Sequence, residues 1–149
     1  MAYANTRLIR ALRVTTARLR EGAGYQWGHL GMCNCGQLAQ TVTKRSKRDI
    51  HEAALAGGGG EWRDRAREYC PTSGLAIDSI VGALLDHGLN THDLADLEYL
   101  DNPRVLARLG PGTHLRRNSR EDLVRYLDAW AELLSEELAE REARAGAAA

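Results

Sequence analysis

The 149-residue chain has no phenylalanine, only three cysteines and three prolines, and no net charge. Its longest apolar run, Ile80 to Leu85, spans about six residues and includes a glycine, against roughly 18 residues for a membrane span. The first ten residues contain two arginines and no apolar core, which is unlike a secretory signal. These absences exclude a membrane-spanning protein and a disulfide-dense secreted module, and we expect a cytoplasmic location.

What is present is ordinary globular composition, with 44% hydrophobic and 27% charged residues. A chain of this length can bury a substantial core without disulfides, so we expect one domain over residues 1–149. Apolar residues recur at helical spacing along most of the chain, and no segment alternates in the way of a half-buried strand. The sequence therefore predicts an all-α fold, a compact bundle of about six or seven helices.

Helix-start and helix-stop residues divide the chain into segments. The expected helices cover residues 5–21, 37–44, 47–56, 62–69, 74–87, a short segment from Thr91, 103–109 and a long segment capped by Asn118. A glycine-rich and cysteine-containing loop is expected at 22–36, a flexible run of four glycines at 57–60, and a frayed tail at 145–149.

Charge is segregated along the sequence although its sum is zero. Residues 1–20 and 104–120 each carry five arginines and no acid, and four of the five residues in 44–48 are basic. Residues 74–101 carry six acids and no basic residue, and residues 121–144 carry eight acids and three arginines. Neighbouring basic and acidic helices could simply pair. The alternative is a basic patch for an anionic partner.

The loop at 22–36 holds five glycines and two cysteines, and the third cysteine stands directly before Pro71. An odd number of cysteines argues against a disulfide framework, whereas thiolate and imidazole together suit a transition metal. We predict a small metal-binding protein, with zinc first and an iron–sulfur cluster second. The predicted ligands are His29, Cys33, Cys35 and Cys70, with His51 in reserve.

The same cysteines allow two other interpretations. Cys35 stands at an expected helix start, where the helix dipole would lower its pKa and favour a reactive thiolate. Cys33 or Cys70 would then be the resolving partner of a thiol redox switch. Alternatively, the cysteines are inert buried side chains that pack as small hydrophobic residues.

A helix-turn-helix is a further alternative for residues 38–50. The second helix would begin with Arg45, Lys47 and Arg48, which could contact phosphates. The fit is poor, because no glycine marks the turn and Ile50 lies one residue too far from Ala39. Nucleic acid is therefore a less favoured partner than protein.

A helical interaction module is the main alternative to metal binding. Its basic segments, residues 7–20 and 44–48, would meet an acidic protein or nucleic acid, and the first helix could also form a homodimer. No phosphate-loop, zinc-protease or nucleophile-elbow motif is present, so the sequence assigns no reaction.

The stretch from Tyr25 to Gly36 reads Y-x-W-G-H-x-G-x-C-N-C-G. It resembles an uncharacterised bacterial protein family of similar length, and the resemblance extends over most of the chain. It implies a stand-alone cytoplasmic protein and supplies no activity, cofactor or partner.

Overall fold

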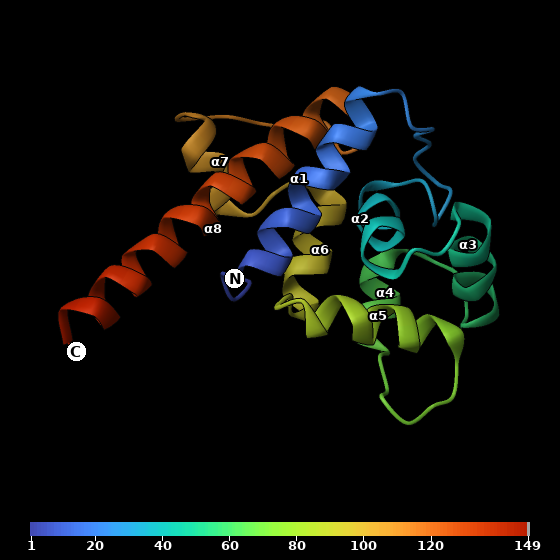
Figure 1. The fold of residues 1–149 in the computed structure, drawn as a ribbon. Coiled ribbons are helices and arrows are strands. Elements are labelled where there is room, and N and C mark those ends of the chain that lie inside the picture. The colour runs from blue at the N-terminus through green and yellow to red at the C-terminus, as the bar shows by residue number, and fades with distance from the viewer. Residues whose placement is uncertain (149) are drawn as a thin grey trace.

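The computed structural model describes residues 1–148, which form eight helices and no strand (Figure 1). The all-α prediction is confirmed. The helices are α1 (Thr6–Arg20), α2 (Asn34–Thr43), α3 (Lys47–Ala56), α4 (Trp62–Arg67), α5 (Ala76–Asp86), α6 (Thr91–Tyr99), α7 (Pro103–Leu109) and α8 (Arg120–Ala148). None of them is both long and apolar enough to cross a membrane, within the residues that the structure describes.

The two longest helices, α1 and α8, pack along each other and carry much of the core (Figure 1). Leucines spaced along α1 are almost fully buried, as their helical spacing predicts. On the facing side, α8 buries Tyr126 and Trp130, whose rings meet edge to face at 5.9 Å. The α1–α8 pair is therefore a major part of the hydrophobic core of the bundle.

Helix α2 occupies the middle of the remaining helices and contacts α1, α3, α5 and α6. It begins at Asn34, three residues earlier than expected, so both loop cysteines lie at or within its first turn. All residues from Cys33 to Ala39 are buried. Burial on every side holds this turn in helical geometry although its glycine and asparagine have low helix propensity.

Helix α8 extends past the body of the molecule, and its end lies away from the other helices (Figure 1). Residues 145–148, which we expected to fray, form its last turn and are exposed. Alanine has the highest helix propensity, which favours this continuation. The remaining residue of the expected tail, 149, lies outside the described residues.

Candidate functional site

The two cysteines of the glycine-rich loop are buried thiols that donate to backbone carbonyls. The Cys33 Sγ lies 3.8 Å from the Leu30 oxygen, and the Cys35 Sγ lies 3.1 Å from the Leu94 oxygen. Burial raises the pKa of Cys33 to about 12 and raises that of Cys35 well above its usual value. The expected lowering of the Cys35 pKa is therefore wrong, because complete burial outweighs the dipole of α2.

Cys70 lies apart from this pair, exposed at the end of the segment after α4. A hydrogen bond with Thr72 lowers the pKa of its thiol. Among residues 1–148, no group of three or more histidine, cysteine or acidic side chains is placed to hold a metal ion. The zinc and iron–sulfur predictions for Cys33, Cys35, Cys70 and His29 therefore remain predictions without an assembled ligand set.

The two histidines proposed as ligands are stacked on each other, with ring centroids 4.1 Å apart. The Nδ1 atom of His29 accepts the Gly31 N–H at 3.1 Å, and that of His51 accepts the Leu30 N–H at 3.0 Å. An imidazole that accepts at Nδ1 carries its proton on Nε2 when neutral, so neither nitrogen offers a free lone pair to a metal. Burial and the neighbouring His51 lower the pKa of His29. These hydrogen bonds instead fix the backbone of the loop.

Two of the loop glycines are required by close backbone contact. A Cβ on Gly31 would overlap the carbonyl of Lys47 in the first turn of α3. A Cβ on Gly36 would lie 2.5 Å from both the Leu30 oxygen and the Gly31 carbonyl carbon. The glycines thus let the loop, α2 and α3 approach backbone to backbone, which accounts for them without a bound ligand.

Asn34 connects this loop to two segments that are far away in the sequence, α6 and the residues before α8. Its side chain is fully buried, and its Nδ2 donates to the Glu98 oxygen at 2.8 Å and the Arg117 oxygen at 2.9 Å. The Tyr25 hydroxyl lies 2.8 Å from the Asn34 Oδ1 and 3.0 Å from the Arg117 oxygen. Burial raises the pKa of Tyr25, so its phenol remains a donor. Tyr25 and Asn34 therefore connect α2 to α6 and to the segment before α8. We call this set of hydrogen bonds the clasp.

The Glu98 side chain is buried, and its Oε2 accepts the backbone N–H of Arg63 at 3.0 Å. Burial raises its pKa to about 6, and the carboxyls of Glu61 and Asp64 add to this effect. A folded-state pKa above the unfolded value of 4.5 means that the group contributes most stability below pH 4.5. That contribution is lost as the pH rises through 6.

We expect Glu98→Gln to be more stable than the wild type at pH 8 by roughly 1–2 kcal/mol, because the buried charge is removed while an acceptor for the Arg63 N–H is kept. At pH 4, where the wild-type carboxyl is protonated, the two proteins should have nearly equal free energies of unfolding. Urea denaturation at both pH values measures this difference. Equal stabilities at pH 8 would contradict the raised pKa of Glu98.

Most exposed arginines outside α1 pair with carboxylates. Six such arginines contact acids on a neighbouring segment or within four residues in the sequence, namely Arg48 with Glu52, Arg63 with Glu61, Arg104 with Glu137, Arg108 with Glu132 and Glu136, Arg116 with Asp122, and Arg125 with Asp122. Pairing of the basic segment 104–120 with the acidic α8 is therefore what the structure shows for Arg104 and Arg108.

The arginines on the exposed side of α1 differ. Arg7, Arg10 and Arg13 have no carboxylate within 4 Å among the described residues, and the same holds for Lys44 after α2. Arg7, Arg10 and Lys44 line one hollow of about 320 Å³. The structure thus brings Lys44 of the basic segment 44–48 beside Arg7 and Arg10 of the segment 7–20.

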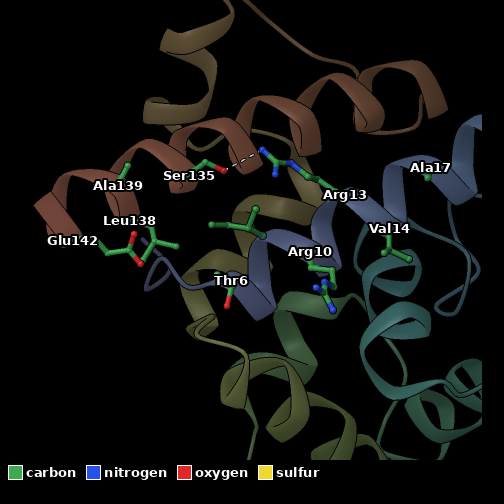
Figure 2. Close-up of a pocket in the computed structure, with 10 residues that line it drawn as sticks. Thr6, Arg10, Arg13, Val14, Ala17, Ser135, Leu138, Ala139 and Glu142 are labelled. Carbon is green, nitrogen blue, oxygen red and sulfur yellow. Dashed lines mark hydrogen bonds between the residues drawn. The ribbon is translucent and has the colours of Figure 1, made fainter.

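A larger hollow of about 550 Å³ adjoins this smaller one, between α1 and α8, and the two share Thr6, Arg10 and Val14 (Figure 2). We call it the α1 groove; it is lined by Thr6, Ile9, Arg10, Arg13, Val14, Ala17, Ser135, Leu138, Ala139 and Glu142. Val14 is 38% exposed, and Arg13 donates to the Ser135 Oγ at 3.1 Å (Figure 2). The groove is therefore an apolar channel that Arg13 bridges, with Arg10 and Glu142 also in its lining.

The helix-turn-helix candidate is formed by α2, a three-residue turn and α3. Lys44 takes the left-handed conformation (φ 61°) in this turn, where a glycine is usual. The proposed contact residues Arg45, Lys47 and Arg48 are all exposed, but Arg48 pairs with Glu52 on the same helix at 2.9 Å. Phosphate contact by these three residues stays a prediction.

Sequence reasoning missed the α8 side of the groove, because its residues contact α1 only in the folded chain. The one signal in the sequence was an apolar residue, Val14, beside the arginines of the first helix. The structure shows that this valine is exposed. Comparison of the chain with known protein families, with curated proteins and with solved structures finds no match in any of the three.

Proposed function

We propose that the protein is a helical interaction module whose α1 groove binds an acidic amphipathic helix of a partner protein. The observation that carries this proposal is the combination of an apolar channel with arginines that have no carboxylate partner among the described residues. Most exposed arginines outside α1 are paired, with Arg67 and Arg117 among the exceptions, so the apolar lining beside Arg10 and Arg13 is what distinguishes this place. The proposal deepens the interaction alternative predicted for segments 7–20 and 44–48.

The channel matches one side of such a helix. Aliphatic side chains from both walls, among them Ile9, Val14 and Leu138, can cover leucines at helical spacing. Arg10 lies exposed beside the groove, and Arg13 reaches between its walls to Ser135, so glutamates on the flank of the helix would meet these two guanidinium groups (Figure 2). Because Arg7 and Lys44 line the adjoining hollow, which shares Arg10 with the groove, they add positive potential that steers an acidic partner.

A protein partner fits this surface better than nucleic acid does. A phosphate backbone gains nothing from an aliphatic channel, and Glu142 in the lining would repel it. The chain as a whole is neutral, whereas nucleic-acid-binding domains are usually basic. The acidic residues Asp49 and Glu52 also lie exposed on α3, the helix that would have to enter a DNA groove.

The test uses a synthetic amphipathic peptide of about 18 residues, with leucines at every third or fourth position and glutamates on both flanks. Fluorescence anisotropy of the labelled peptide measures its Kd. We expect saturable binding that weakens at least about tenfold in Arg10→Glu and also weakens in Val14→Ser, because one variant removes a positive charge of the lining and the other the apolar contact. Arg67→Glu is the matched control, since Arg67 is also exposed and has no carboxylate partner among the described residues.

Three results would contradict the proposal. Binding that Arg67→Glu weakens as much as Arg10→Glu would show charge attraction without a site. Tighter binding of a duplex DNA of about 20 base pairs, with a steep dependence on salt, would favour nucleic acid. Self-association of the chain in sedimentation velocity that Arg10→Glu disrupts would make a second copy the occupant of the groove.

A further inference from the structure

Three residues of the glycine-rich loop converge on one residue far away in the sequence. The buried Asn34 and the Tyr25 hydroxyl both reach the backbone carbonyl of Arg117, at 2.9 Å and 3.0 Å. The Trp27 ring lies against the side chain of the same arginine, with its centroid 5.4 Å from the guanidinium carbon. The clasp and Trp27 therefore hold Arg117 at its backbone and at its side chain.

The guanidinium of Arg117 is held by aromatic rings, but it makes no hydrogen bond or ion pair within the described part of the chain. Besides Trp27 it contacts the Tyr99 ring, at 4.9 Å from the centroid. Arg63 lies over that ring too, at 4.8 Å, and is paired with Glu61 at 3.4 Å. Arg117 has no such pair and no side-chain hydrogen bond among residues 1–148, although it is exposed. Contact with the two rings holds the planar group, and its N–H donors remain without a partner within the described residues.

A hollow of about 430 Å³ adjoins this arginine. His114, Arg116 and Asn118 line it beside Arg117, and Asp101 is the one carboxylate of the lining. Arg116 is partly neutralised by Asp122, whose Oδ2 lies 3.5 Å from its Nε. The volume falls within the usual range for sites that bind small molecules.

From this convergence we infer that the hollow at Arg117 binds the phosphate group of a small organic phosphate, such as a sugar phosphate or a mononucleotide. A guanidinium presents two parallel N–H donors that match two phosphate oxygens, and a fixed one loses little entropy on binding. His114 and Asn118 add donors from the same segment. The Asp101 carboxylate can accept from hydroxyl groups of a sugar, which favours a phosphate ester over the inorganic ion.

Isothermal titration calorimetry with inorganic phosphate, ribose 5-phosphate and AMP tests the inference. Trp27 gives a second readout, because its ring contacts Arg117, whereas the other two tryptophans, Trp62 and Trp130, are fully buried. We expect ribose 5-phosphate or AMP to bind more tightly than inorganic phosphate and to change the fluorescence. Arg117→Gln should raise the Kd at least about tenfold, whereas Arg67→Gln, at an exposed arginine that does not line the hollow, should leave it unchanged.

Arg117→Lys separates a bidentate contact from simple charge. It keeps the positive charge but not the fork of donors, so it should bind several-fold more weakly than the wild type. The inference is overturned if none of the three compounds binds at 5 mM, a concentration of the order of weak ligand affinities. It is also overturned if Arg117→Gln binds as well as Arg67→Gln, or if a single-stranded oligonucleotide binds far more tightly than AMP.

Discussion

Gly31→Ala should lower the free energy of unfolding by about 3 kcal/mol, because the new Cβ would overlap a backbone carbonyl that cannot rotate away. That carbonyl belongs to Lys47, so relief requires α3 to move away from the loop. The effect is a steric consequence of backbone contact between two segments. Urea denaturation followed by circular dichroism measures it as a shift of the midpoint.

Gly28→Ala is the matched control in the same loop. Gly28 has a positive φ of 93°, but nothing lies within 4 Å of the position of its Cβ. This change should cost only about 1 kcal/mol, from backbone strain alone. Equal losses at Gly28 and Gly31 would contradict the contact between the loop and α3. A marked fall in the midpoint of the wild type on adding a chelator would instead support the zinc prediction.

Asn34→Ala should also destabilise the protein by about 3 kcal/mol, because buried polar groups lose their partners. The Glu98 carbonyl would lose its donor, and the Arg117 carbonyl would retain only the Tyr25 hydroxyl. A small cavity would remain where the amide had been. The free energy of unfolding from urea denaturation is again the measurement.

Asn90→Ala calibrates this loss. Asn90 caps α6 through a reciprocal pair of hydrogen bonds with Asp93, and removal of such a cap typically costs about 1 kcal/mol. An Asn34→Ala loss no larger than the Asn90→Ala loss would show that the clasp contributes little. The stability of Asn34→Ala should be restored neither by zinc nor by iron, since the asparagine acts through hydrogen bonds.

Local signals predicted most of the helices. Ser46 stands directly before the helix expected at 47–56, and its Oγ accepts the Asp49 N–H at 3.1 Å. Asn102 and Pro103 stand at the start of the helix expected at 103–109, and the Asn102 side chain caps α7. Such signals succeed because a cap depends on residues three or four positions apart. The start of α2 was placed too late, because its first turn depends on burial by distant helices.

The site was harder to predict for the same physical reason. Glycine next to cysteine and histidine is compatible with a metal loop, and it is equally compatible with backbone packing against another helix. What separates the two is the environment of Gly31, Cys35 and Asn34, which are placed by α3, α6 and the segment before α8. The basic segments themselves were predicted, whereas their meeting around α1 follows from the packing of α1 on α2.

The most direct test of the α1 groove is a map of backbone amide chemical shifts in the ¹⁵N-labelled protein, titrated with the acidic amphipathic peptide. We expect the changes to concentrate on the two walls of the groove, at Ile9, Arg13 and Val14 of α1 and at Leu138 of α8. Changes confined to residues 44–56, or an absence of changes at α1 when the peptide is in excess, would contradict the proposed function.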